Sequence, residues 1–317
     1  MLAVLAPVCA EYLWAYDDTT GDAVVLIGGL IIFTPLYGCP ALLIREVARR
    51  RGLGWPSMLL LGAAFGLVEA GIVDQSMWST NYRDISYWHE MSAPTYIEPI
   101  GLSVFLLVTF VGGHVVNSMC APIAVVEGLA GTRGQQPWLS RWTVPLVVLL
   151  YAGASALVLG DHLRNETDHA SAGQLAGTAV AVLLLVALAL APIRRPRGQR
   201  PPAAPDPWLV GLAAAAAFAV AQVYGPSPLG TDALLATELV AVGLVWWLSG
   251  RSGWGPRHAA GLATGALVAA GALAFLSDPI GDVSTARQLG HNMILLVLVA
   301  AVGALGVRRG GGRSVAG

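Results

Sequence analysis

Long apolar blocks that alternate with short charged loops constrain this chain more than any other feature. Each block runs for about 17–25 residues, the length that an α-helix needs to cross the hydrocarbon core of a bilayer. Hydrophobic residues make up 56% of the 317 positions. We therefore predict an all-α polytopic transmembrane helix bundle of nine or ten spans, with the nine clearest near residues 23–44, 56–73, 100–122, 143–160, 173–193, 207–224, 232–249, 258–277 and 289–307.

The arginines predict how the bundle is oriented. The chain has no lysine, and all but three of its 18 basic residues fall in alternate loops, which are 45–55, 127–142, 194–206, 250–257 and the tail 308–317. Short loops rich in arginine stay on the cytoplasmic side. This pattern predicts a cytoplasmic C-terminus. Arginine without lysine, together with abundant Ala, Gly and Val, is typical of a GC-rich bacterial genome, so we expect a multi-pass protein of the plasma membrane.

The first sixteen residues allow two interpretations. They are apolar but short, and they lack the basic start of a signal peptide. They could form an abbreviated tenth span or a helix lying on the membrane surface. We favour the tenth element.

The spans differ in character along the chain. Residues 1–193 form a front half with polar side chains inside the membrane, and residues 207–317 form a rear half of plain Ala, Leu and Val helices. Between them, residues 194–206 predict a cytoplasmic linker rich in Pro and Arg. Glycines four residues apart allow close helix packing; the pairs are Gly62/Gly66, Gly173/Gly177 and Gly261/Gly265.

Glu69 is the sharpest functional candidate. Gly62, Gly66, Glu69 and Val73 fall on one face of the second span, so Glu69 should point at protein, some 6–8 Å below the outer end. Ionisable side chains inside a membrane are costly and usually serve a purpose. We interpret Glu69 as a ligand or proton site; the alternative is a buried glutamate satisfied by a neighbouring helix.

Other polar side chains extend this candidate site. His114 and Asn117 share a face of the third span, while Asp74 and Glu238 lie toward the outer ends of their helices. If the helices converge, these residues form a polar pocket open to the outside. The alternative for Glu238 is a structural role at the membrane interface, near the end of its helix. The aromatic-rich loop 74–99 could be a lid over this pocket or an interfacial belt.

Two further features concern the architecture. Pro35, Gly38 and Pro40 predict a helix break in the first span, since each proline removes a backbone donor. Broken helices often line substrate sites, although a plain kink is the alternative. Arg45 and Glu127 are expected to pair at the inner ends of spans one and three as a structural latch.

Several functional classes find no support in the sequence. The net charge of −1 argues against nucleic acid. The three cysteines lie in separate segments without ligand spacing, so we expect no metal and no cofactor. Without lysine, a serine–lysine dyad is excluded.

The sequence resembles two families of membrane proteins in part. Glu69 and the FxxxH element Phe110–His114 are similar to two elements of the CAAX-protease-like (CPBP) intramembrane metalloproteases, which would imply metal-assisted hydrolysis. The paired glutamates of that family become Glu69-Ala70 here. The segment 37–76 and the residues around Glu11 resemble a family of uncharacterised actinobacterial integral membrane proteins, which implies a multi-span fold.

The sequence therefore favours a transporter-like or ligand-binding protein whose partners are the lipid bilayer and an unknown small solute or ion. A non-transporting sensor or assembly component is the alternative. An intramembrane metalloprotease comes third, so an enzyme is the less favoured class.

Overall fold

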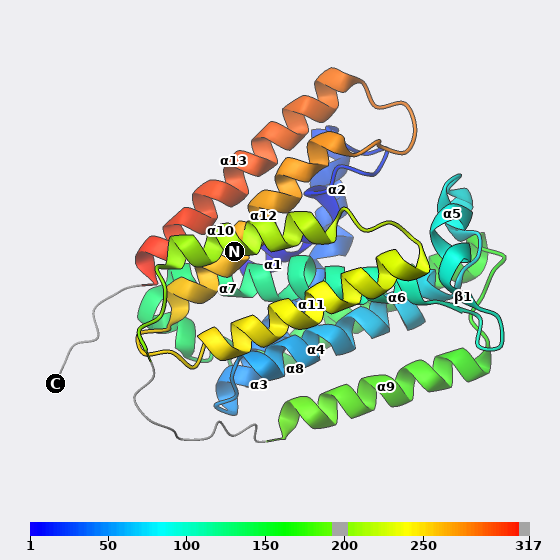
Figure 1. Ribbon diagram of the computed structural model, residues 1–317. Helices are drawn as coiled ribbons and strands as arrows, with labels where there is room; N and C mark the ends of the chain where they lie inside the picture. The colour runs from blue at the N-terminus through cyan, green and yellow to red at the C-terminus, as the bar shows by residue number, and fades with distance from the viewer. Residues whose placement is uncertain (192–201, 311–317) are drawn as a thin grey trace.

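The computed structural model describes residues 1–191 and 202–310, and most of them are helical (Figure 1). The helices are α1 (Leu2–Pro7), α2 (Ala23–Phe33), α3 (Cys39–Arg50), α4 (Trp55–Val68), α5 (Trp88–Ser92), α6 (Val104–Gly113), α7 (Ala121–Ala130), α8 (Thr143–Asn165), α9 (Ala172–Leu190), α10 (Pro207–Ala221), α11 (Pro228–Leu248), α12 (Pro256–Leu273) and α13 (Thr285–Arg309). Two short antiparallel strands, β1 (Tyr96–Ile97) and β2 (Leu102–Ser103), pair just before α6. Most of the predicted linker 194–206 lies outside the described residues.

In the part of the chain that the structure describes, four segments of π-helix, in which the hydrogen bonds run from i to i+5, continue these helices. They are η1 (Val8–Tyr12), η2 (Thr34–Gly38), η3 (Glu69–Val73) and η7 (His114–Cys120). The remaining short elements are 3₁₀-helices of three to five residues; these are η4 (Ser76–Trp78), η5 (Tyr82–Asp84), η6 (Ala93–Thr95), η8 (Gly131–Gln135) and η9 (Ala274–Leu276).

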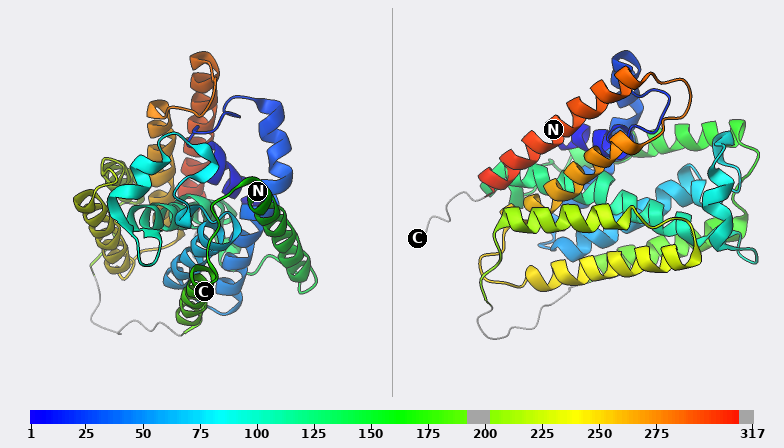
Figure 2. Two further views of the ribbon diagram at one scale, coloured as in Figure 1. Left: turned by 90° about the vertical axis from the view of Figure 1, so that its right-hand side faces the viewer. Right: turned by 45° about the horizontal axis from the view of Figure 1, so that its top comes forward.

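Among the described residues, eight continuous helices are long and apolar enough to cross a membrane, and two apolar helices are shorter. The eight are Ala23–Arg50, Trp55–Val73, Val104–Gln135, Thr143–Asn165, Ala172–Leu190, Pro228–Leu248, Pro256–Leu276 and Thr285–Arg309; the shorter two are Leu2–Tyr12 and Pro207–Ala221. Most of the long helices run broadly side by side, with α2, α12 and α13 inclined to the rest (Figure 2). The predicted all-α polytopic bundle is confirmed.

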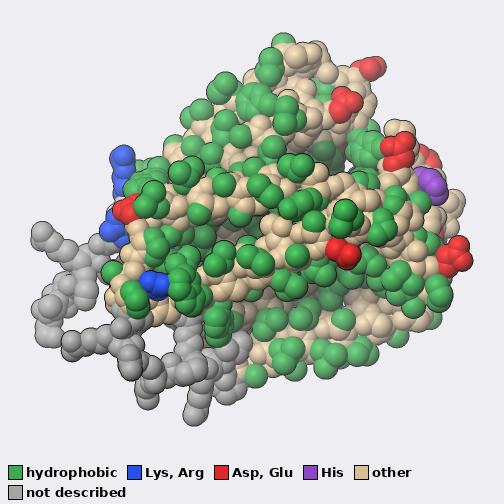
Figure 3. Space-filling model, in the orientation of Figure 1, with side chains coloured by type: hydrophobic (Ala, Val, Ile, Leu, Met, Phe, Trp, Pro, Cys, Tyr) green, Lys and Arg blue, Asp and Glu red, His purple; other side chains and the backbone are tan. Residues whose placement is uncertain are grey.

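Charged side chains gather at opposite ends of the bundle. The visible face carries its arginines near the C-terminus and most of its carboxylates at the far end (Figure 3). We name these the arginine-rich end and the acidic end. Between them, leucines such as Leu149 and Leu183 are more than two-thirds exposed, which suits contact with lipid.

The helix Leu2–Tyr12 lies inside the bundle. Ala6 and Cys9 are fully buried, and Gly38 of η2 approaches so closely that a Cβ there would overlap the carbonyl oxygen of Ala3. This segment therefore packs as part of the bundle, and its crossing of the membrane stays a prediction.

The predicted break at Pro35, Gly38 and Pro40 is corrected by the structure. The helix Ala23–Arg50 continues through all three residues, and its hydrogen bonds widen into the π-helix η2. Pro35 sits in the first turn of η2 and Pro40 in the first turn of α3. The wider turn accommodates the missing proline N–H groups without interrupting the helix.

Two of the three predicted glycine pairs pack as expected. Gly66 lies against Val111 and His114, and Gly265 lies against the backbone of Gly211 in α10. The third pair does not pack, since no atom of another element lies within 4 Å of a Cβ at Gly177. Helix α9 packs mainly along α4 and also contacts η3 through Thr178, which faces Gly71.

Candidate functional site

The four π-helical segments meet in one region of the bundle. Segment η1 contacts η7, while η2 and η3 both pack against α8. Each segment contributes one polar side chain to this region; they are Glu11, Tyr37, Glu69 and His114, which we name the Tyr37 cluster. A π-helical turn shifts a side chain away from the ordinary helical register and often occurs at functional sites.

Tyr37 connects the other members of the cluster. Its ring stacks on the imidazole of His114, with 6.0 Å between the centroids and 25° between the planes. Its hydroxyl interacts with the carboxylate of Glu11, which also accepts a hydrogen bond of 2.8 Å from the Tyr16 hydroxyl. Phe65 stands edge-on to the His114 ring, at a centroid distance of 5.5 Å. One tyrosine therefore joins residues that lie far apart in the sequence.

Glu69 is the most deeply placed carboxyl of the cluster. It is 1% exposed, and its Oε2 atom has no hydrogen-bond partner among the described residues. The charged groups that act on it are Asp74 and Glu11, both acidic. The hydroxyls of Tyr37 and Tyr151 also lie within electrostatic range. A carboxylate in this position would be costly, so the site favours a bound proton or a bound cation.

His114 and Asn117 both lie on η7. The His114 Nδ1 atom is 3.1 Å from the hydroxyl of Ser118, and the partly exposed imidazole faces Tyr37. Asn117 is 4% exposed, and its Oδ1 atom is unpaired within the described part of the chain. The structure thus stacks His114 on Tyr37, and Glu69 lies within electrostatic range of the same tyrosine.

Asp74 follows η3 at the acidic end. Its Oδ1 atom accepts a hydrogen bond of 2.9 Å from the backbone N–H of Ser76. The carboxyl is only partly exposed, and burial raises its pKa from 3.8 to about 6. It lies within electrostatic range of Glu69 and Glu11.

Glu238 lies apart from the Tyr37 cluster. Its carboxylate packs directly against Gly112 of α6, and no charged neighbour acts on it among the described residues. Because α11 begins at Pro228, Glu238 stands nearer the middle of this helix than predicted. The expectation that it shares a pocket with Glu69 and His114 gains no support from these contacts.

The loop 74–99 folds over the acidic end. Trp88 is 4% exposed and donates a hydrogen bond of 2.9 Å to the carbonyl oxygen of Ser79. Asp168 accepts hydrogen bonds from the backbone and hydroxyl of Thr80, at 2.6 and 2.9 Å. Arg83 is exposed and acts electrostatically on both Glu11 and Asp74.

A second polar group lies at the arginine-rich end. The Arg45 side chain is fully buried, 3.1 Å from Glu127 and stacked on the ring of Trp138. Arg49 also binds Glu127, and Glu46 accepts a hydrogen bond from the backbone N–H of Trp138 at 2.8 Å. The expected proximity of Arg45 and Glu127 is therefore present, while the role of a latch remains a prediction.

The sequence interpretation missed Tyr37 and Tyr151. A tyrosine between Pro35 and Gly38, in a segment already marked as irregular, was a usable signal for Tyr37. For Tyr151 the sequence offers no signal, since it stands in an ordinary apolar span.

Within residues 1–191 and 202–310, no group of three or more His, Cys, Asp or Glu side chains is arranged to hold a metal ion. The model of an uncharacterized membrane protein family matches residues 1–253. No curated protein and no solved structure matches the chain.

Proposed function

Since the chain belongs to this uncharacterized membrane protein family, we propose that it binds a small cationic solute inside the membrane, in exchange for a proton, at the Tyr37 cluster. One observation carries the proposal. Glu69 is a buried carboxyl with an unpaired oxygen, and the charged groups that act on it are acidic.

The surroundings of Glu69 suit a cation because they contain aromatic rings as well as carboxyl groups. Aromatic rings attract cations through their faces, and Tyr37, Phe65 and Tyr151 line the region. The carboxylates of Glu11 and Glu69 would supply the countercharge. In the absence of a cation, a proton neutralises Glu69, so the arrival of a cation releases that proton.

Access to the cluster is proposed from the acidic end. Glu11 and Asp74 are both partly exposed, while Glu69 is closed off. Clustered negative charge raises the local concentration of cations. The arginine-rich end is then the cytoplasmic side, as the distribution of arginines between the loops predicts.

The test is cation-driven proton release. Protein in lipid nanodiscs and weak buffer receives tetramethylammonium or sodium chloride, and a pH indicator reports released protons. We expect release from the wild type and its loss in Glu69→Gln, which keeps the shape of the side chain. Glu98→Gln, at an exposed position, is the matched control and should behave like the wild type.

Two results would overturn the proposal. One is release of equal size from the Glu69→Gln variant. The other is the absence of release from the wild type with both salts, provided that the nanodisc preparation is folded by circular dichroism.

A further inference from the structure

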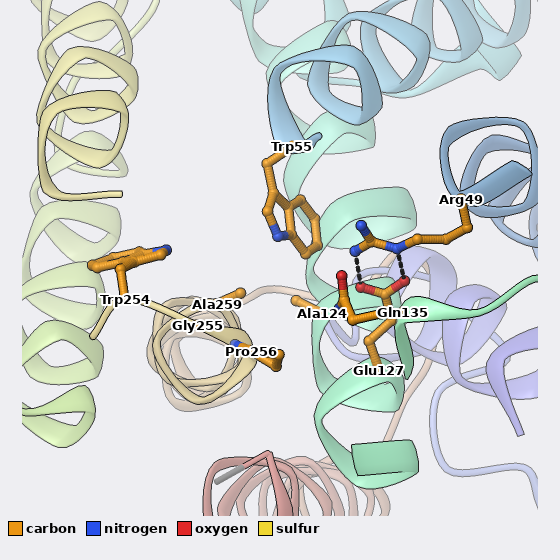
Figure 4. Close-up of a pocket in the computed structure, with 9 residues that line it drawn as sticks. All are labelled: Arg49, Trp55, Ala124, Glu127, Gln135, Trp254, Gly255, Pro256 and Ala259. Atoms are coloured by element: carbon orange, nitrogen blue, oxygen red, sulfur yellow. Dashed lines mark hydrogen bonds and ion pairs between the residues drawn. The ribbon is translucent and has the colours of Figure 1, made fainter. Parts of the chain in front are cut away.

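A cavity of about 150 Å³ opens at the arginine-rich end, remote from the Tyr37 cluster (Figure 4). It lies between α3, α4, α7 and the start of α12, beside η8. Its lining residues are Arg49, Trp55, Ala124, Glu127, Gln135, Trp254, Gly255, Pro256 and Ala259. Two tryptophans and an ion pair therefore surround one space.

Hydrogen-bond donors predominate in this cavity. Arg49 binds Glu127 through Nε at 2.7 Å and through Nη2, while its Nη1 points toward Trp55 (Figure 4). The indole nitrogen of Trp254 points toward Trp55, whose own indole nitrogen lies on the side of its ring that faces Trp254 and not Arg49 (Figure 4). Glu127 has little capacity left to accept hydrogen bonds from a ligand, because Arg45 and Arg49 already bind its two oxygens. A ligand that accepts hydrogen bonds is therefore favoured.

The charge balance decides between two kinds of ligand. Paired tryptophans can hold a quaternary ammonium group through cation–π contacts. Here, however, three arginines, Arg45, Arg49 and Arg50, are paired with only two carboxylates, Glu46 and Glu127, which leaves a net charge of +1. The local charge is positive, which disfavours a cation and favours an anion.

The cavity is built before any ligand arrives. The Trp254 ring stacks on His258, with 4.7 Å between centroids and 21° between planes. His258 is held in turn by the backbone of Gly255 and the carbonyl of Pro205. A preformed site loses less conformational entropy on binding.

From this geometry we propose that the cavity binds the phosphate group of an anionic phospholipid. Basic pockets between transmembrane helices commonly take such headgroups. The small apolar side chains of Ala124, Pro256 and Ala259 give the glycerol a surface to rest on. A bound lipid would bridge α3, α4 and α7 to α12. This inference is independent of the proposed function, since it involves a different end of the bundle.

The experiment measures lipid retention. Protein from nanodiscs of phosphatidylcholine, with or without phosphatidylglycerol, is analysed by native mass spectrometry. We expect retained phosphatidylglycerol in the wild type and roughly tenfold weaker binding in Trp254→Leu and Arg49→Gln, because each loses a donor. Trp142→Leu is the matched control at the same end of the bundle, at a side chain that is 74% exposed. Trp254→Leu keeps the test decisive if Arg49→Gln fails to fold.

Three outcomes would overturn the inference. The first is unchanged phosphatidylglycerol retention in Trp254→Leu. The second is equal retention of phosphatidylcholine. The third is displacement of the lipid by millimolar glycerol phosphate, which would assign the cavity to a soluble phosphate ester.

Discussion

The imidazole of His114 lies over the ring of Tyr37, with 6.0 Å between the two centroids. This stack joins the third long span to the first. Through its hydroxyl, Tyr37 also reaches Glu11, and it lies within electrostatic range of Glu69. The proposed cation site therefore depends on a side chain that has no charge at neutral pH.

Replacing Tyr37 by Phe should separate function from folding. The ring stack on His114 is kept, but the hydroxyl that faces Glu11 is lost. Loss of one such interaction costs about 1 kcal/mol of the free energy of unfolding, so the melting temperature should fall by only a few degrees. Cation-driven proton release should weaken strongly. Tyr37→Leu, which removes the ring as well, should lower the melting temperature further. Unchanged proton release in Tyr37→Phe would contradict this role.

Gly265→Ala should destabilise the bundle. A Cβ at this position would overlap the carbonyl oxygen of Gly211, so α10 and α12 would have to separate. Overpacking of this kind costs about 1–3 kcal/mol or more. Gly177→Ala is the matched control, because its Cβ would meet open space and helix propensity favours alanine. Thermal unfolding in detergent compares the two. Equal melting temperatures would show that the close contact between Gly265 and Gly211 does not contribute to stability.

Glu127→Gln should be among the most damaging conservative substitutions. It leaves Arg45 and Arg49 buried with one countercharge fewer, and an unpaired buried charge costs about 3–5 kcal/mol. Asp22→Asn tests an exposed ion pair instead. Asp22 lies 3.6 Å from Arg287, both side chains are 42% exposed, and the loss should be within about 1 kcal/mol. Chemical denaturation of both variants gives the comparison, and a mild effect of Glu127→Gln would refute the prediction.

Asp74 should contribute a pH dependence to stability. Burial raises its pKa to about 6, so the folded protein holds the proton more tightly than the unfolded chain does. Its stabilising contribution is fully present below about pH 4 and is lost as the pH rises through about 6.

Asp74→Asn should abolish that part of the pH dependence. Between pH 4 and 7 the variant should lose less stability than the wild type, and at pH 7.5 it should be more stable by roughly 1–3 kcal/mol. Melting temperatures measured across this range give the slopes. Asp84→Asn, at an exposed position, should keep the wild-type slope. Identical slopes for wild type and Asp74→Asn would argue against a titrating Asp74.

The sequence specifies the spans because bilayer thickness fixes the length of an apolar helix. The sequence also predicts the charges at the two ends of the bundle, because charged residues fall in the loops between the apolar spans. The position of Glu238 near the middle of α11 could not be predicted from the apolar residues, because Ser227 and Pro228 begin the helix before the apolar run does. The Ser227 side chain caps this helix by accepting a hydrogen bond from Gly230 N–H.

The Tyr37 cluster could not be predicted as a unit. A π-helical turn differs from an α-helical turn by about one residue, and it leaves no distinct pattern of apolar residues. Glu69 and His114 were found because ionisable groups stand out in apolar spans. Their meeting at Tyr37 depends on how separate helices pack, and a single sequence does not record that contact.

The protonation state of Glu69 is the most direct test of the proposed cation site. Infrared spectra of the protein in lipid nanodiscs, recorded from pH 5 to 9, separate protonated from ionised carboxyls by their carbonyl stretch. We predict a protonated-carboxyl band at neutral pH that shrinks when tetramethylammonium is added and that Glu69→Gln lacks. A wild-type spectrum identical to that of Glu69→Gln would show Glu69 to be ionised at neutral pH and would contradict the proposed exchange of proton for cation.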